Sequence, residues 1–211
     1  MSDYSFGPLV PDSYYHLFNR GNNRQDVFFQ DWDYRLFLMR CPRFVDPVAE
    51  VYAYCLLPNH FHMLIRIRSR QELMPGLLHK DVNRKKTIRS VEDYASDQFS
   101  NWFNSYTRTT NKYRRRDGNL FKRPFQRKEV DTPEYFKRLV RYIHWNPQYH
   151  GLVDDFRTWK YSSYHAMLCA EPTRLQREAV LARFGGVAGF RAWHELDRAV
   201  DGDAVAGWEG E

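Results

Sequence analysis

Residues 51–67 read VYAYCLLPNHFHMLIRI, and this stretch decides the fold that the sequence predicts. Two runs rich in β-branched, aromatic and other apolar residues flank Pro58-Asn59, a pair typical of tight turns. Because so short a link joins antiparallel neighbours, we expect two adjacent antiparallel strands. The second strand alternates in character: Phe61 and its apolar partners point to one face, while His60 and His62 share the other.

The histidine pair favours a metal site. Same-face neighbours on a strand lie roughly 6.5 Å apart, so the ring nitrogens of His60 and His62 can converge on one ion. Two histidines do not complete a coordination sphere, and the remaining positions indicate a catalytic ion with oxygen ligands from another segment and from the substrate. The alternative is a pair of partly exposed sheet histidines without a ligand.

Further elements on both sides of this pair complete one fold. The sequence predicts strands over 14–20 and 125–131 and helices over 31–43 and 91–112. The order strand, helix, strand, strand, helix, strand is that of a ferredoxin-like α+β sandwich, whose antiparallel sheet carries helices on one face. Residues 70–90 are polar and basic, and we expect a loop there.

After the sandwich the pattern is helical. Thr132 is a predicted helix cap with Pro133 in the first turn, and Asn146-Pro147 should end this helix. Short helices are expected around 161–168, 174–184 and 187–196, followed by a frayed acidic end. We therefore predict a main domain over residues 1–165 and a helical C-terminal extension over 166–211.

Two residues of the predicted helix after Thr132 extend the metal hypothesis. Tyr142 and Asn146 are four residues apart, so they are neighbours on one helix face. The Asn146 amide oxygen could join His60 and His62 around Mg²⁺ or Mn²⁺, with the Tyr142 hydroxyl placed to attack phosphorus. Free tyrosine is only about 0.1% ionised at pH 7, so the metal or a bound water must help remove its proton. The alternative is a core tyrosine and a routine Asn-Pro helix end.

The basic residues are unevenly distributed. The net charge is +6, and nine Lys or Arg between positions 108 and 128 stand against one acid, Asp117. This concentration predicts contact with a polyanion, although it is also compatible with a solvated loop. Tyr106, Tyr113, Phe121 and Phe125 are interleaved with it and could stack on unpaired bases.

The predicted DNA contacts share a positive charge and a place near the metal pair or in this basic segment. They are Arg20, Arg24, Arg66, Arg114, Arg115, Arg116, Lys122, Arg123, Arg127 and Lys128. A smaller basic run precedes them, at Lys80, Arg84, Lys85, Lys86 and Arg89.

Composition narrows the class of protein. The chain of 211 residues has no run of 18 apolar residues, and its first residues do not resemble a secretion signal, so we expect a soluble cytoplasmic protein. Cys41, Cys55 and Cys169 have unrelated spacings, which predicts buried thiols rather than disulfides or a cysteine metal site.

Five segments in order resemble the single-tyrosine HUH transposases, and among them the REP-associated tyrosine transposases and their insertion-sequence relatives. The segments are FNRGNNR at 18–24, LPNHFHML at 57–64, LFKRPF at 120–125, RYIHWNP at 141–147 and WKYSSY at 159–164. The resemblance covers roughly residues 14 to 165 and carries no function onto the tail.

This resemblance implies roles for the residues above. His60 and His62 correspond to the metal pair, Asn146 to the third ligand and Tyr142 to the nucleophile. Such enzymes cleave single-stranded DNA near a hairpin, form a 5′-phosphotyrosine link and leave a free 3′-hydroxyl, so rejoining needs no ATP. Insertion-sequence members usually carry Gln in place of Asn146, which makes the REP-associated type the better match and leaves both a monomer and a homodimer open.

Two other functions remain possible from the sequence. A non-catalytic single-stranded nucleic-acid-binding module would need the fold and the basic residues only. A metal-dependent hydrolytic nuclease would attack with water and would tolerate Tyr142→Phe.

Overall fold

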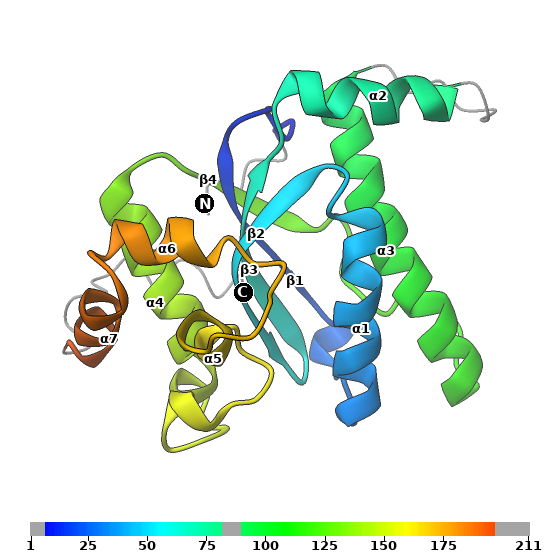
Figure 1. Cartoon of the computed structure of the whole chain (residues 1–211). Coiled ribbons are helices and arrows are strands. Elements are labelled where there is room, and N and C mark those ends of the chain that lie inside the picture. The colour runs from blue at the N-terminus through cyan, green and yellow to red at the C-terminus, as the bar shows by residue number, and fades with distance from the viewer. Residues whose placement is uncertain (1–6, 82–89, 197–211) are drawn as a thin grey trace.

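A computed structural model of the chain describes residues 7–81 and 90–196. Its centre is a four-stranded antiparallel sheet in the order β2-β3-β1-β4 (Figure 1). The strands are β1 (Tyr14–Arg20), β2 (Ala49–Leu57), β3 (His60–Ile67) and β4 (Gln126–Val130). This is the strand order of the predicted ferredoxin-like sandwich, and the tight β2-β3 pair is confirmed.

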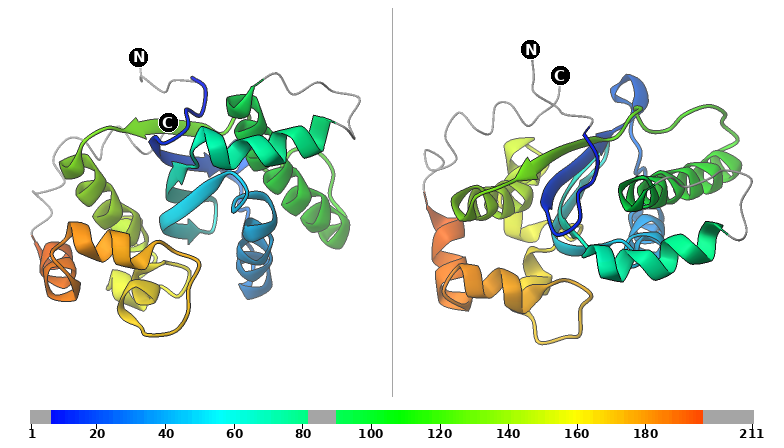
Figure 2. Two further views of the ribbon diagram at one scale, coloured as in Figure 1. Left: turned by 45° about the horizontal axis from the view of Figure 1, so that its top comes forward. Right: turned by 90° about the horizontal axis from the view of Figure 1, so that it is seen from above.

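Helices cover both faces of the sheet, which differs from the predicted one-sided arrangement. Helices α1 (Asp31–Phe44) and α3 (Val91–Arg114) pack on one face, as predicted, and α4 (Pro133–Tyr149) covers the other (Figures 1 and 2). Both faces of β1, β2 and β3 are mostly buried, so each face of the sheet packs against helices. Phe61, Met63 and Ile65 join the core under α1 and α3, whereas Leu64 joins the core under α4.

Residues 70–81 form a helix, α2 (Arg70–Asp81), so the predicted loop is wrong for this part. A capping box starts the helix: the Ser69 backbone N–H donates to Glu72 Oε2 at 2.9 Å, and the Ser69 hydroxyl accepts from the Glu72 N–H. Leu73 is fully buried and fixes the helix against the core. Residues 82–89, with four of the five residues of the smaller basic run, lie outside the described part of the chain.

Helix α4 begins as predicted but runs further. Thr132 Oγ1 accepts from the Tyr135 backbone N–H at 3.2 Å and caps the first turn. The predicted end at Asn146-Pro147 is wrong, because the last turn is held by other bonds: the His150 N–H donates to the Asn146 carbonyl at 3.1 Å. Pro147 removes one donor without ending the helix.

The chain after α4 packs back against that helix. It contains a 3₁₀ turn at Phe156–Thr158 and the helices α5 (Tyr164–Leu168), α6 (Arg177–Arg183) and α7 (Val187–Glu195), and these three helices confirm the predicted short helices. The acidic end from residue 197 lies outside the described chain. No described helix is both long and apolar enough to span a bilayer.

A buried histidine pair joins α7 to α4. His144 Nδ1 and His194 Nε2 are 2.9 Å apart, and His144 Nε2 is 2.8 Å from the Ser163 hydroxyl. His194 Nδ1 donates to the Phe190 carbonyl at 2.8 Å. When both rings are neutral, each of these three hydrogen bonds has one proton and each is satisfied. The pair therefore links α4 to α7 without a buried charge.

The cysteines fit the prediction in part. Cys41 and Cys55 are buried free thiols, and burial raises the pKa of both. Cys169 is exposed, so the prediction of a buried thiol is wrong there. Its place on the surface follows from its position directly after the five-residue helix α5.

Candidate active site

The two histidines of β3 lie under α4. His60 pairs with Arg20 and His62 with Phe18 across the β1-β3 ladder, so both side chains leave the sheet on its α4 face. Their ring centroids are 5.1 Å apart, and the residues are only 7% and 2% exposed. Both are therefore positioned by rigid backbone and enclosed by the packed helix.

Helix α4 brings the tyrosine and the asparagine to this pair. Asn146 Oδ1 lies 3.3 Å from His60 Nε2, although 86 residues separate the two in sequence. One turn earlier on α4, the Tyr142 ring lies 5.3 Å from the His62 ring between centroids. Both Tyr142 and Asn146 are fully buried. The structure thus brings together all four residues that the sequence suggested for one site.

A third histidine lies beneath the site. His16 of β1 is fully buried, and its Nε2 is 2.9 Å from His62 Nδ1. The sequence interpretation missed it. The alternation of residues 14–20 puts His16 on the same strand face as Phe18, and this was the available sequence signal. Only the pairing of β1 with β3 places that face beside His62.

Hydrogen bonds at one nitrogen of each histidine leave the other nitrogen for a ligand. His60 Nδ1 is 2.6 Å from Asn59 Oδ1, and His62 Nδ1 is occupied by His16. Among the described residues, His62 Nε2 is buried without a hydrogen-bond partner. In metal-binding histidines, a hydrogen bond at the nitrogen that does not bind the metal fixes the tautomer and the orientation of the ring.

All three rings are neutral near pH 7. Burial lowers the pKa of His16 and of His60 to about 3, and it holds the pKa of His62 well below its usual value. Neighbouring cationic groups add to the effect, among them Arg20 for His60 and His62. Neutral imidazole is the form that binds metal ions.

The spacing of the polar atoms suits two ligands of one ion. Adjacent ligands of an octahedral ion with bonds of about 2.1 Å lie about 3.0 Å apart, close to the 3.3 Å between His60 Nε2 and Asn146 Oδ1. No cluster of three or more His, Cys, Asp or Glu with metal-binding geometry occurs in residues 7–81 and 90–196. A metal here would accordingly depend on the asparagine oxygen and on oxygens from water or substrate.

Two comparisons with known proteins relate this chain to one family of transposases. A protein of Haemophilus influenzae that carries the provisional name REP-associated tyrosine transposase is 27% identical over 124 residues, which cover 58% of this chain. A solved structure of a REP-associated tyrosine transposase bound to a REP hairpin superposes with a TM-score of 0.56 and 17% identity, covering 82% of this chain and 89% of that one. This chain resembles the REP-associated tyrosine transposases.

The sequence match covers only part of each protein. The match spans 62% of the length of the Haemophilus influenzae relative, and no protein-family model matches the chain. The structural neighbour supports the α+β fold with its helical C-terminal part. The roles of the site residues therefore depend on the geometry of the site.

The structure divides the DNA contacts that were predicted from the distribution of charge into two groups. Two of them form ion pairs within the protein: Arg66 pairs with Asp12 at 2.6 Å, and Arg114 pairs with the buried carboxylate of Asp33 at 2.7 Å. Arg114 also lies over the Phe29 ring, 4.0 Å from its centroid.

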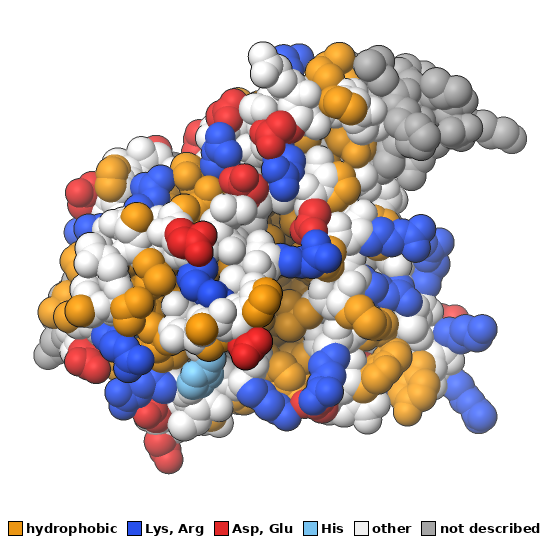
Figure 3. All heavy atoms as spheres, viewed as in Figure 1, with side chains coloured by type: hydrophobic (Ala, Val, Ile, Leu, Met, Phe, Trp, Pro, Cys, Tyr) orange, Lys and Arg blue, Asp and Glu red, His pale blue; other side chains and the backbone are white. Residues whose placement is uncertain are grey.

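The other predicted contacts lie near the surface or at the site. Exposed members are Arg24, Arg115, Lys122, Arg123 and Lys128. Arg20, Arg116 and Arg127 are partly buried, and Arg20 lies opposite His60 in the sheet. Basic side chains are also plentiful along the α3 side of the molecule (Figure 3). Their contact with DNA stays a prediction.

The predicted stacking residues are mostly core residues. Tyr106, Phe121 and Phe125 are 0%, 4% and 7% exposed, so the prediction that they stack on bases is wrong for this structure. They line the apolar layer between α3 and the sheet, because their helical or strand periodicity points them inward. Tyr113 is 63% exposed, and its ring lies 5.5 Å from the Trp32 ring between centroids.

Proposed function

We propose that this chain is a metal-dependent DNA nickase and strand transferase that uses Tyr142 as its nucleophile. The observation that carries the proposal is the approach of Asn146 Oδ1 to within 3.3 Å of His60 Nε2, beside Tyr142 and His62. Four buried polar residues from a strand and a helix distant in sequence have no need to converge for packing alone.

The donor atoms support a cation between β3 and α4. With the amides oriented as found, His60 Nδ1 donates to Asn59 Oδ1, so its Nε2 carries a lone pair toward the Asn146 oxygen. Two acceptors facing each other in a buried site are unfavourable unless a cation lies between them. The lowered pKa of His60 argues against a proton in that role at pH 7. His60, His62 and Asn146 would hold Mg²⁺ or Mn²⁺.

The chemistry then follows from the residues present. Bound there, the ion would supply Lewis-acid polarisation of a phosphate oxygen. Tyr142 Oη gives up its proton to solvent water and forms a bond to phosphorus while the bond from phosphorus to the 3′-oxygen breaks, and that oxygen leaves as a hydroxyl after taking up a proton from water. The 5′-phosphotyrosine ester keeps the energy of the original ester, so the reverse attack by a 3′-hydroxyl rejoins a strand.

Access to the nucleophile requires movement. Tyr142 is fully buried in this structure, with the rings of His16, His62 and Tyr149 around it. A phosphate can reach its hydroxyl only if the side chain or the end of α4 shifts outward. His150, at the exposed end of α4, lies 4.8 Å from the His60 ring between centroids and marks the side from which substrate enters.

The proposed substrate is single-stranded DNA next to a hairpin. Support comes from the REP-associated neighbour, whose solved structure holds a REP hairpin, and from the exposed basic residues of this chain. We propose that the activity takes place in the cytoplasm. We propose no oligomeric state beyond a monomer or a homodimer.

The test is a denaturing gel of labelled hairpin DNA with a single-stranded flank, incubated with protein and Mn²⁺. We expect a protein-linked DNA band with the wild type and none with Tyr142→Phe. Tyr113→Phe is the matched control, because Tyr113 is exposed and lies on α3. Cleavage without an adduct would indicate a hydrolytic nuclease, and binding without cleavage would indicate a non-catalytic module.

A further inference from the structure

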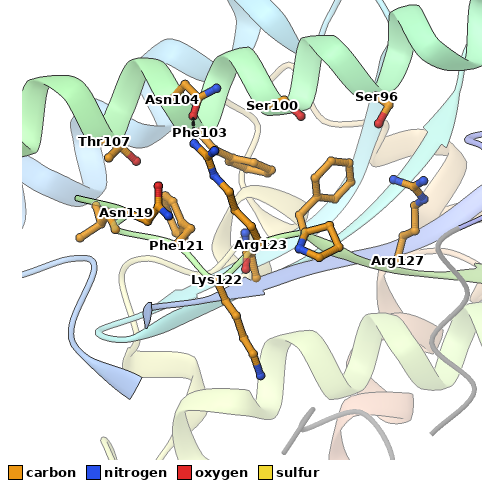
Figure 4. Close-up of a pocket in the computed structure, with 14 residues that line it drawn as sticks. Ser96, Ser100, Phe103, Asn104, Thr107, Asn119, Phe121, Lys122, Arg123 and Arg127 are labelled. Carbon is orange, nitrogen blue, oxygen red and sulfur yellow. Dashed lines mark hydrogen bonds between the residues drawn. The ribbon is translucent and has the colours of Figure 1, made fainter. Parts of the chain in front are cut away.

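A groove of about 620 Å³ lies on the α3 face of the sheet, behind the candidate active site (Figure 4). One wall is α3, and the other is the segment over 119–127 that leads into β4. Its floor includes Asn19, whose neighbour in β1, Arg20, points to the opposite face and pairs with His60. The groove and the active site are thus back to back at one end of the sheet.

The α3 wall carries a row of neutral hydrogen-bonding side chains. Ser96, Ser100, Asn104 and Thr107 are spaced by about one helical turn and line the groove together. None of them is fully buried, and their hydroxyl and amide groups both donate and accept. Such groups can bond to the edges of unpaired bases.

The opposite wall is cationic. Lys122, Arg123 and Arg127 line the groove, and no Asp or Glu does. Arg123 reaches across the groove to Asn104, with 2.8 Å from its Nη2 to Asn104 Oδ1, whereas Lys122 points away from α3 (Figure 4). The consecutive cations Lys122 and Arg123 therefore extend to opposite sides of the segment. Here the Lys122 N–H donates to the Arg20 carbonyl, which joins the segment to β1.

The surroundings define where an anionic strand would run. A smaller hollow adjoins the groove at Ser96 and Arg127, and it is lined by Glu92 and Asp93. These acids disfavour phosphate beyond Ser96, so the favourable path runs from Arg127 toward Lys122 and the end of β1. From Ser96 to Thr107 the helix rises about 16 Å, room for at most about five stacked nucleotides.

We infer that this groove binds an unpaired segment of the DNA substrate, with phosphates along Arg123 and Arg127 and base edges along the Ser96 to Thr107 row. This rests on the proposed function. The row of hydroxyl and amide groups favours an unpaired segment over a duplex, because pairing occupies the base edges to which these groups would bond. A strand that leaves the groove past Lys122 passes the end of β1 and reaches the His60 side of the sheet.

The test measures DNA binding by fluorescence anisotropy with full-length Tyr142→Phe protein in EDTA, so that neither cleavage nor metal affects the result. The probes are a stem-loop with an unpaired flank and the same stem-loop without it. We expect Arg123→Gln and Ser100→Glu each to weaken binding of the flanked probe by about tenfold or more and to leave the unflanked probe unchanged.

Matched controls are Arg191→Gln on α7 and Met39→Glu on α1, which make the same changes of charge at exposed positions outside the groove. Flanked-probe affinity equal to that of the parent in both groove variants would overturn the inference. So would an equal loss with the unflanked probe, because the groove would then act on the stem.

A second measurement needs no substitution in the groove. A flank carrying 5-iodouracil is irradiated with the Tyr142→Phe protein, and the cross-linked peptide is identified. Cross-links within 96–107 or 119–127 support the groove, and cross-links confined to other segments contradict it. If the denaturing gel shows no protein-linked DNA but the anisotropy and cross-linking results are as expected, the nickase proposal is rejected and the assignment of the groove as a binding site for an unpaired strand stands.

Discussion

His16 Nε2 lies 2.9 Å from His62 Nδ1, deep beneath the candidate metal site. If His62 Nδ1 donates in this bond, its Nε2 keeps the lone pair that a metal ion needs. His16 is neutral, so it orients His62 without adding a buried charge. Its proposed role is to position a ligand through a hydrogen bond.

His16→Phe should weaken Mn²⁺ binding by about 10–100-fold, because the ring volume remains while the acceptor for His62 is lost. The measurement is titration of Mn²⁺ followed by electron paramagnetic resonance. His16→Gln, whose amide oxygen can accept the same bond, should recover much of the affinity. Equal binding by wild type and His16→Phe would remove His16 from the site.

Asn146→Ala should also weaken Mn²⁺ binding, since it removes the oxygen that approaches His60. Asn146→Asp should bind at least as tightly as the wild type, because a carboxylate is a charged oxygen ligand for the same hard ion. Isothermal titration calorimetry can compare the three proteins. Unchanged affinity in Asn146→Ala would show that the amide is a helix-end residue only.

Acid should destabilise the protein through its buried histidines. Burial lowers the pKa of His194 to about 4 and that of His144 well below its usual value. Below pH 6.5 these histidines are protonated in the unfolded chain but stay neutral in the native protein. The free energy of unfolding therefore falls as the pH drops toward 4, whereas above pH 6.5 these groups contribute no pH dependence. Each contributes up to about 1.4 kcal/mol per pH unit.

Urea unfolding in EDTA between pH 7.5 and 4 measures this dependence. The free energy of unfolding of His194→Asn should fall less steeply with decreasing pH than that of the wild type, because the variant lacks one buried neutral imidazole. His165→Asn is the control, because His165 is exposed. A slope in His194→Asn as steep as in the wild type would contradict the assignment.

Arg114 and Lys128 should behave differently although both were predicted to contact DNA. Arg114 bonds to the fully buried Asp33, so Arg114→Met should lower the free energy of unfolding by roughly 1.5–3 kcal/mol. Lys128 is exposed, and Lys128→Met should leave stability unchanged while reducing the salt dependence of single-strand binding by about 0.7 in the logarithmic slope. Urea unfolding tests the stability of both variants, and anisotropy at several salt concentrations tests their DNA binding. An Arg114→Met protein with the same free energy of unfolding as the wild type would contradict the structural role of Arg114.

The strand alternation of residues 51–67 was enough to predict the β2-β3 pair and the shared face of His60 and His62. The spacing of Tyr142 and Asn146 likewise predicted one helix face. What remained hidden depends on contacts between distant segments: His16 beside His62, and α4 on the second face of the sheet. Helix α2 was predictable in principle, because the Ser69 to Glu72 capping box is local, but the Pro75-Gly76 pair favoured a loop.

The central claim is that Tyr142 is the residue that becomes linked to DNA. The most direct measurement is proteolysis of the protein-DNA adduct formed with Mn²⁺, followed by mass spectrometry of the nucleotide-bearing peptide. We expect a phosphodiester link from Tyr142 to the 5′ end of the cleaved strand. A link at another residue, or to the 3′ end, would contradict it.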